Sequence, residues 1–381
     1  MRFNYEQEWN SEILNNLCQF YKGNGLSKND LSDSGYSCIL YGQLYTTYLN
    51  EVITSTVSKT NAKLDNPFYA KRNDLIIPSS GEDPIDIAVA RSLQVDNVLL
   101  GGDLNVLRPK SILNSSFLSY QLNGKRKVDI AKIAQGKSIV HLHNCDLKRI
   151  KINYPCIEEQ NKIANLLFQL DKLIETQIKI IKDLESVKNE ISNRIFKLKL
   201  IEKSTKYLAE YLREGDKTPV NTFKYKKITI KLNKQGIVYS DINRDMADTR
   251  PFYIRHKDEL IIGKQNYFNG SIAIVDEQYD NCICSNAIMS FNVVGINKEF
   301  LYFQLSNNNY LNSQSYKANG TGQKELSEKE LLNFKIWCPS IEEQIKIVNC
   351  FKALDGKIKN EKAVLNSYMQ EKDYLLTNMF I

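Results

Sequence analysis

The chain has 381 residues, of which 42% are hydrophobic and 25% are charged, and its formal net charge is +7. This length suits two domains better than one core, and the mild basic excess permits a nucleic-acid partner without demanding one. No segment approaches the roughly 20 apolar residues that span a bilayer, and the N-terminus is polar. The eight cysteines are scattered, so we expect reduced thiols in a cytoplasmic protein with no membrane partner.

Residues 1–154 are expected to form the first globular domain. Short apolar runs between Gly, Asn, Ser and Asp indicate strands near residues 38–41, 74–78, 97–100 and 105–107. Helices are expected near residues 9–19, 112–122 and 128–135. This mixture predicts an α+β fold with a predominantly antiparallel, irregular sheet.

Residues 155–200 are expected to form one long helix, because no Gly or Pro occurs from residue 157 to about 198. Alternating steps of three and four residues place apolar side chains along one stripe, which is typical of a coiled-coil seam. The predicted seam contains Ile163, Leu167, Leu170, Ile174, Ile181 and Leu184.

The second half of the chain repeats this organisation. Residues 201–338 return to short apolar runs and turns, near residues 227–231, 259–262, 271–275 and 291–294, and are expected to form a second globular domain. Residues 339–381 are expected to form a second long helix, although Gly356 weakens it. Its predicted seam contains Ile347, Phe351, Leu354, Ile358, Leu365 and Tyr368.

The strongest signal is an internal duplication. Pro155-Cys-Ile-Glu-Glu-Gln160 opens the first helix and Pro339-Ser-Ile-Glu-Glu-Gln344 opens the second, 184 residues later. Residues 69–77 match 253–262, and residues 117–122 match 300–305, in the same order. Such a repeat predicts two similar units related by a pseudo-twofold axis. The segments between the matches diverge, so the scaffold is duplicated and the surfaces are not.

Three polar residues interrupt each seam at matching places: Gln160 and Gln344, Gln177 and Glu361, and Lys188 and Lys372. Isolated polar residues in a seam set register and orientation. We therefore expect the helices to pair antiparallel, with Gln177 opposite Glu361. The alternative is that these positions simply face water.

The duplicated set resembles the specificity subunit of type I restriction-modification systems, in which two target-recognition domains alternate with two long helices that open with Pro-x-x-x-Glu-Gln. The resemblance covers essentially the whole chain. It implies two pseudo-twofold-related target-recognition domains, separated by two long antiparallel coiled-coil helices, that read the halves of a split, asymmetric double-stranded DNA target. It also implies two modification subunits, which methylate adenine N6, and restriction subunits, which cleave DNA.

Catalytic motifs are not recognisable in the chain. Asn66-Pro-Phe-Tyr69 lacks the second proline of an adenine-methyltransferase loop, and no phosphate-binding loop is present. His141-Leu-His-Asn-Cys145 and Cys282-Ile-Cys284 lack the spacing of a structural zinc site. We expect a non-catalytic chain that binds no metal or cofactor, with S-adenosylmethionine, ATP and Mg²⁺ on the partner subunits. The alternatives are a self-sufficient methyltransferase and a coiled-coil adaptor that binds proteins and not DNA.

Polar and aromatic stretches beside the predicted strands are the candidates for DNA contact, because forks of Arg, Lys, Asn and Gln read base edges. The alternative for each residue is a solvated turn. Lys264 follows residues 260–262 much as Ser79 follows residues 75–77, which favours these two loops. The candidates in the first domain are Tyr41, Gln43, Tyr45, Thr46, Tyr48, Ser79 and Ser80. Those in the second are Asn243, Arg244, Lys264, Gln265, Asn266, Tyr267 and Asn269.

Overall fold

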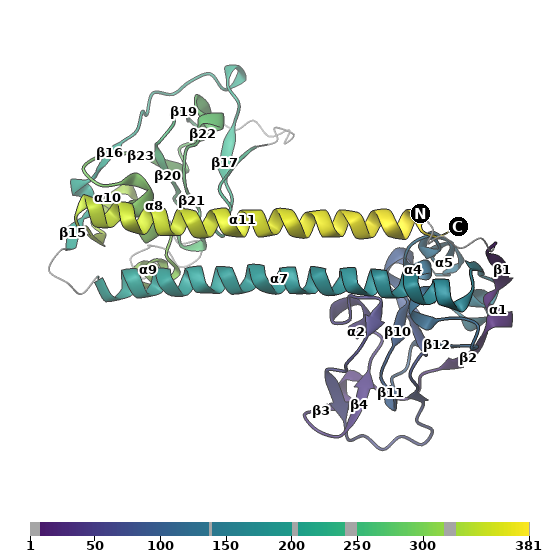
Figure 1. Ribbon diagram of the computed structural model, residues 1–381. Coiled ribbons are helices and arrows are strands. Elements are labelled where there is room, and N and C mark those ends of the chain that lie inside the picture. The colour runs from purple at the N-terminus through teal and green to yellow at the C-terminus, as the bar shows by residue number, and fades with distance from the viewer. Residues whose placement is uncertain (1–7, 137–138, 200–204, 241–249, 316–324, 381) are drawn as a thin grey trace. The chain divides into compact units, whose positions relative to one another are not determined.

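The computed structural model describes residues 8–136, 139–199, 205–240, 250–315 and 325–380 (Figure 1). The chain divides into two compact units. Unit 1 contains Met1–Lys179 and Lys362–Ile381, and unit 2 contains Ile180–Glu361. Each long helix is therefore shared, since one end of it belongs to each unit.

Unit 1 is built on two five-stranded sheets, in the orders β2-β12-β8-β10-β5 and β3-β6-β4-β11-β7. Most pairs are antiparallel, as expected, but β10 pairs with β5 and β11 pairs with β4 in parallel. Its strands are β1 Asn10–Ile13, β2 Cys18–Lys22, β3 Leu31–Ser32, β4 Tyr36–Ile39, β5 Val52–Ile53, β6 Ser58–Thr60, β7 Tyr69–Ala70, β8 Leu75–Pro78, β9 Ser80–Gly81, β10 Arg91–Leu93, β11 Val98–Leu100, β12 Leu104–Pro109, β13 Val140–His141 and β14 Lys151–Tyr154. Its short helices are α1 Leu14–Leu17, η1 Lys28–Asp30, α2 Gln43–Thr46, α3 Pro84–Ile87, α4 Ser115–Asn123, α5 Lys127–Ile133 and α6 Asn144–Leu147.

The core of unit 1 joins side chains from both ends of the chain. Buried residues of β8, β12 and α4 pack with Ile163, Leu167 and Leu170 of α7. Met379 and Phe380 belong to the same cluster, and the Phe380 ring centroid lies 5.3 Å from that of Phe117. The last turns of the chain are therefore part of the first domain's core.

Unit 2 repeats the central sheet in a smaller form, in the order β16-β23-β20-β21, with two-stranded pairs β15-β24, β17-β18 and β19-β22. Its strands are β15 Thr205–Tyr207, β16 Leu212–Glu214, β17 Ile228–Ile230, β18 Ile237–Tyr239, β19 Phe252–Arg255, β20 Leu260–Gly263, β21 Ile272–Ile274, β22 Cys282–Ser285, β23 Ile288–Val293 and β24 Lys335–Trp337. Its short helices are η2 Leu208–Glu210, η3 Thr222–Lys224, η4 Tyr267–Asn269, η5 Glu277–Tyr279, α8 Lys298–Leu305, α9 Asn308–Gln314 and α10 Glu328–Leu332.

The sequence repeats form equivalent elements in the two units. Residues 69–77 lie in β7 and β8 and residues 253–262 in β19 and β20, while residues 117–122 lie in α4 and residues 300–305 in α8. The central antiparallel pairs also correspond, because β12 pairs with β8 as β23 pairs with β20. The predicted duplication is confirmed at the level of these elements.

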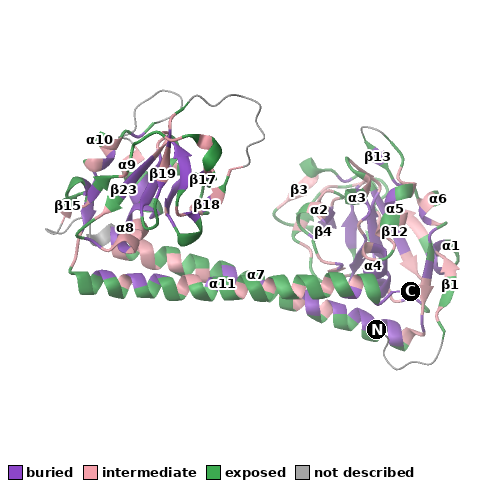
Figure 2. Cartoon of the chain, turned by 90° about the horizontal axis from the view of Figure 1, so that it is seen from above, coloured by how far each residue is buried: buried purple, intermediate pink, exposed green. Residues whose placement is uncertain are grey.

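The long helices are α7, Ile157–Lys199, and α11, Ile341–Asn378. At 1.5 Å per residue, α7 is about 65 Å long. All twelve predicted seam residues are buried or half-buried, while most other positions of both helices are exposed (Figure 2). This burial agrees with the predicted seam, and the pairing of these side chains along it stays a prediction.

The motif glutamines join the start of each long helix to the N-terminus of a short helix earlier in the same unit, α4 in unit 1 and α8 in unit 2. The Gln160 Oε1 accepts a bond from the backbone N–H of Asn114 (2.8 Å), and its Nε2 donates to the carbonyls of Ile112 and Pro155 (3.0 and 2.9 Å). Asn114 is the N-cap of α4. These bonds satisfy a buried amide and fix the start of α7 against α4.

Gln344 repeats this arrangement in unit 2. Its Oε1 accepts a bond from the backbone N–H of Asn297, the N-cap of α8, at 2.8 Å. Its Nε2 donates to the carbonyl of Pro339 at 2.9 Å. Both glutamines are almost fully buried, so the alternative that these two seam positions face water is wrong.

The seam lysines connect the two helices in an antiparallel register, and they do so differently in each unit. In unit 1, Lys372 of α11 pairs with Asp171 of α7 (2.6 Å) and with Glu51 (2.7 Å). In unit 2, Lys188 of α7 pairs with Asp355 of α11 (2.5 Å). The predicted antiparallel pairing is confirmed within each unit, whereas the pairing of Gln177 in unit 1 with Glu361 in unit 2 stays a prediction.

One predicted helix is wrong. Residues 9–19 contain only the single turn of α1, which lies between β1 and β2. β1 pairs with β14, so Asn10 lies opposite Tyr154. This long-range pairing overrides the local helical pattern.

Candidate nucleic-acid interface

The two candidate segments of unit 1 lie together. The Tyr45 hydroxyl of α2 donates a bond to the carbonyl of Ser80 in β9 at 3.0 Å. Burial raises the pKa of Tyr45, and the nearby Tyr41, Asp86 and Asp103 add to this effect, so the hydroxyl remains a donor. Tyr41 and Thr46 stay exposed. The structure thus brings α2 and β9 together.

Two candidate residues of this segment have structural roles. Tyr48 is buried, and its hydroxyl accepts a bond from the backbone N–H of Val57 at 3.0 Å. Tyr48 therefore cannot reach DNA, and its prediction as a contact residue is corrected. The Gln43 side chain accepts from the backbone N–H of Leu40 and donates to Ser58, although it remains half-buried.

Ser79 and Lys264 occupy equivalent places, as the sequence predicts. The backbone N–H of Ser79 donates to the carbonyl of Asp103 (2.8 Å), and that of Lys264 donates to the carbonyl of Ala287 (2.9 Å). Their carbonyls accept bonds from the N–H groups of Leu142 and Leu326, respectively. The backbone is therefore the same at these two places, while the side chain changes from a small hydroxyl to a long cation.

The loop after Lys264 is anchored by Tyr267. Tyr267 is fully buried, and its hydroxyl donates to the carbonyl of Leu305 at 2.9 Å. Its prediction as a DNA contact is corrected, because it holds the loop against α8. Gln265, Asn266 and Asn269 are exposed.

Two candidates, Asn243 and Arg244, lie outside the described residues.

Among the residues that the structure does describe, no group of three or more His, Cys, Asp or Glu side chains is placed to hold a metal ion. Cys284 is buried and its sulfur accepts a bond from Arg255 Nε at 3.0 Å. Burial raises the pKa of this thiol.

Three surface features were missed by the sequence reasoning. Tyr253 and Asn286 lie near Lys264 around a cavity of unit 2. Phe223 is 96% exposed beside the basic run 224–227. Tyr253 belongs to a repeated segment, and that signal could have found it. The positions of Asn286 and Phe223 depend on turns that no sequence pattern marks.

In the described part of the chain, no helix has both the length and the apolar character needed to cross a membrane. The arrangement is that of a recognition protein. Each unit has an α+β scaffold joined to two antiparallel helix segments, and it presents polar and aromatic loops that differ between the units.

Comparison with known proteins gives the family. The sequence model of the type I restriction modification DNA specificity domain matches residues 6–186 and again residues 187–367. The type I restriction enzyme MjaVIII specificity subunit of Methanocaldococcus jannaschii is 23% identical over 348 residues, which cover 84% of this chain and 80% of that protein.

Two solved structures share the fold. The S subunit of a type I restriction-modification system from M. genitalium superposes with a TM-score of 0.64 at 19% identity, covering 100% of this chain and 98% of that one. A chain from a structure of type I complex assembly and conformational transition gives 0.58 at 14% identity, covering 98% of each.

This chain belongs to the family of type I restriction-modification DNA specificity proteins, and it contains two copies of the specificity domain. The resemblance on which the sequence reasoning relied is confirmed. The chain is a DNA sequence-specificity subunit, and the protein-binding adaptor without DNA binding is not favoured.

Proposed function

We propose that unit 1 and unit 2 each read one half of a split DNA target, and that the long helices bind two modification subunits. These partners supply S-adenosylmethionine and methylate one adenine N6 in each half-site. Restriction subunits, with ATP and Mg²⁺, join them to cleave unmodified DNA. The chain itself supplies specificity and no catalytic group, and it acts in the cytoplasm, where the DNA is.

The observation that carries this proposal is the contrast between the two loops on equivalent backbones. Ser79 and Lys264 make the same pair of main-chain bonds, but their side chains offer different hydrogen-bonding groups to a ligand. Base edges are distinguished by such groups in the major groove. Two units with one scaffold and different loops should therefore read different half-sites, so the target is asymmetric.

The test is a selection of duplexes from a random library by the complex of this chain with its modification subunits. We expect the selected duplexes to share two different short sequences separated by a fixed unread gap. The logarithm of their affinity should fall linearly with the logarithm of salt concentration, because basic contacts release phosphate counterions. Enrichment of no sequence, or affinity that does not depend on salt, would contradict the proposal.

A further inference from the structure

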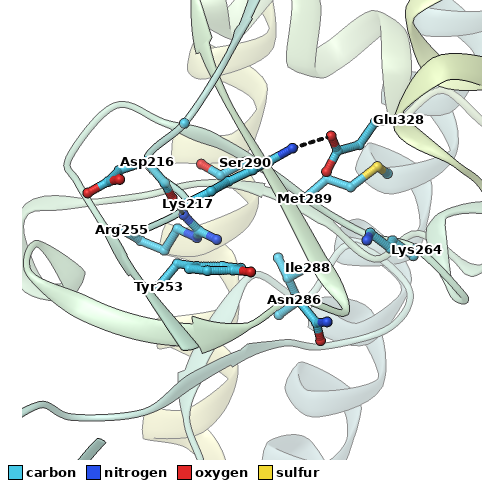
Figure 3. Close-up of a pocket in the computed structure, with 11 residues that line it drawn as sticks. Asp216, Lys217, Tyr253, Arg255, Lys264, Asn286, Ile288, Met289, Ser290 and Glu328 are labelled. Carbon is cyan, nitrogen blue, oxygen red and sulfur yellow. Dashed lines mark hydrogen bonds and ion pairs between the residues drawn. The ribbon is translucent and has the colours of Figure 1, made fainter. Parts of the chain in front are cut away.

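Unit 2 has a cavity of about 170 Å³ beside the loop that begins at Lys264 (Figure 3). It lies where the side chains of β19, the end of β20 and the β22–β23 turn converge. Tyr253, Lys264 and Asn286 line it, and Ile288 and Met289 add an apolar wall.

Most charged groups of the lining are already satisfied. Glu328 pairs with Lys217 at 2.6 Å, and Asp216 accepts bonds from the N–H and hydroxyl of Thr218 at 2.8 Å. Arg255 is 2% exposed, and its NH1 donates to the carbonyls of Asp216 and Ile254, both at 3.0 Å. These charged groups therefore already have partners within the protein.

Three polar side chains of the lining remain available. The Lys264 ammonium, the Asn286 amide and the Tyr253 hydroxyl make no hydrogen bond to any other described residue, and all three are half-buried. The Tyr253 ring is held by the Arg255 guanidinium, whose carbon lies 5.4 Å from the ring centroid. A half-buried polar group without a partner forgoes its hydrogen-bonding energy unless water or a ligand supplies the bond.

The equivalent place in unit 1 keeps a tyrosine, Tyr69, but lacks the cation and the amide. Lys264 is replaced by Ser79, and the turn residues Asn286 and Ala287 are replaced by Gly102 and Asp103, although the main-chain bond between loop and turn is kept. At these equivalent positions, the Lys264 ammonium and the Asn286 side-chain amide are therefore present in unit 2 and not in unit 1. Side chains that differ while the backbone stays the same are the ones with which the two units would recognise different half-sites.

We propose that this cavity reads a purine base of the half-site recognised by unit 2, through Lys264 and Asn286. A purine presents N7 with O6 or the N6 amine at its major-groove edge, and Lys and Asn are side chains that pair with this edge. The amide supplies a donor and an acceptor, whereas a phosphate would use donors alone. The inference rests on the proposed function, since it requires that unit 2 bind DNA.

The test uses the complex with modification subunits and the target selected by the wild-type chain. Competition binding is measured on duplexes in which each base pair of both half-sites is replaced in turn. The variants are Lys264→Ala, Asn286→Ala and the conservative Lys264→Arg. Lys231→Ala, which removes an exposed charge of unit 2 outside the cavity, is the matched control. Thermal unfolding of each variant checks that it is folded.

We expect the wild-type complex to discriminate by about tenfold or more at one purine position, which is what one good base contact supplies. Lys264→Ala and Asn286→Ala should lose most of this discrimination at that position only, while the other half-site is read as before. Lys264→Arg should keep it, and the Lys231→Ala control should read the whole target as the wild type does.

Other outcomes separate the two proposals. Equal weakening of all duplexes with a smaller salt dependence would make Lys264 a phosphate contact and overturn the inference. Unchanged discrimination in both alanine variants would also overturn it, while the proposed function would stand. A wild-type complex that selects no sequence would defeat the proposed function and the inference together.

Discussion

Gln160 and Gln344 occupy the same place in the two units and share two backbone bonds, one from the N-cap N–H of a short helix and one to the carbonyl of the motif proline. Each is buried at the start of a long helix, and each bridges that helix to the N-cap of a short one. Burial of an amide is favourable only while its bonds are made. This explains why the motif that opens both helices ends in glutamine.

The first prediction follows from these bonds. Gln160→Ala and Gln344→Ala should each lower the free energy of unfolding by about 1–3 kcal/mol, because each leaves buried backbone groups without a partner. Chemical denaturation measures the change. Lys346→Ala, at an exposed position two residues after Gln344, should change it by less than about 0.5 kcal/mol. Wild-type stability in both glutamine variants would contradict this role.

The second prediction compares the two seam lysines. The Lys372 side chain is 16% exposed and its partners Asp171 and Glu51 are 2% and 7% exposed, so Lys372→Met should cost about 3–5 kcal/mol. Lys188 and Asp355 are 28% and 46% exposed, so Lys188→Met should cost at most about 1 kcal/mol. Equal losses in the two variants, measured by denaturation, would show that burial does not set the cost.

The third prediction concerns pH. Burial raises the pKa of Asp171, Glu51 raises it further, and Lys372 opposes both effects. The folded state then keeps a proton that the unfolded chain releases near pH 4, so this group's contribution to stability falls as pH rises above about 4. Lys372→Met removes the opposing cation, so the pKa of Asp171 should rise further and the fall in stability should extend to higher pH. Denaturation across pH tests this, and a fall that ends at the same pH as in the wild type would contradict it.

At the scale of elements, α11 contains a glycine that its backbone does not need. Gly356 is exposed, and a Cβ placed there would meet nothing within 4 Å. Gly270 has a φ of +78°, where an L side chain is strained.

The fourth prediction uses this contrast. Gly356→Ala should raise the free energy of unfolding by about 0.5–1 kcal/mol through helix propensity and reduced entropy of the unfolded chain. Gly270→Ala should lower it, because the turn requires a left-handed residue. Thermal unfolding of both variants decides. Destabilisation by Gly356→Ala would mean that α11 needs local flexibility or close contact at that point.

The sequence predicted the elements whose periodicity is strong and local. The seams of α7 and α11, the strands around residues 75–78 and 260–263, and the duplication itself were all predictable. The strand β1 near residue 10, where a helix was predicted, was not predictable, because β1 forms only by pairing with residues 151–154.

The candidate site was predicted less completely for a related reason. Tyr48 and Tyr267 look like surface aromatics in sequence, but long-range packing buries them. Lys264 and its equivalence to Ser79 were found from the repeat. Asn286 was not found, because only the folded β22–β23 turn brings it beside Lys264.

At the scale of the whole molecule, the N-terminal and C-terminal parts of the chain pack together in unit 1. Residues after 362 belong to that unit, and the buried Leu375, Met379 and Phe380 complete its core. The core of the first target-recognition domain is therefore complete only when the C-terminal part of α11 packs against it.

The fifth prediction follows from this packing. Deleting residues 374–381 should destabilise unit 1 by several kcal/mol, since each large buried apolar side chain is worth about 2–5 kcal/mol. Hydrogen exchange of the full-length and shortened chains measures it by region. Protection should fall in β8 and β12 of unit 1 and remain in β20 and β23 of unit 2. Equal loss in both units would contradict the division into two units.

The central claim is that one duplicated scaffold carries two different readers. Its most direct test is to map N6-methyladenine on the DNA of cells that express this chain with its modification subunit. The account predicts one split motif with two unlike halves, a fixed gap and one methylated adenine in each half. A palindromic motif, or an assembled complex that methylates no defined sequence, would contradict it.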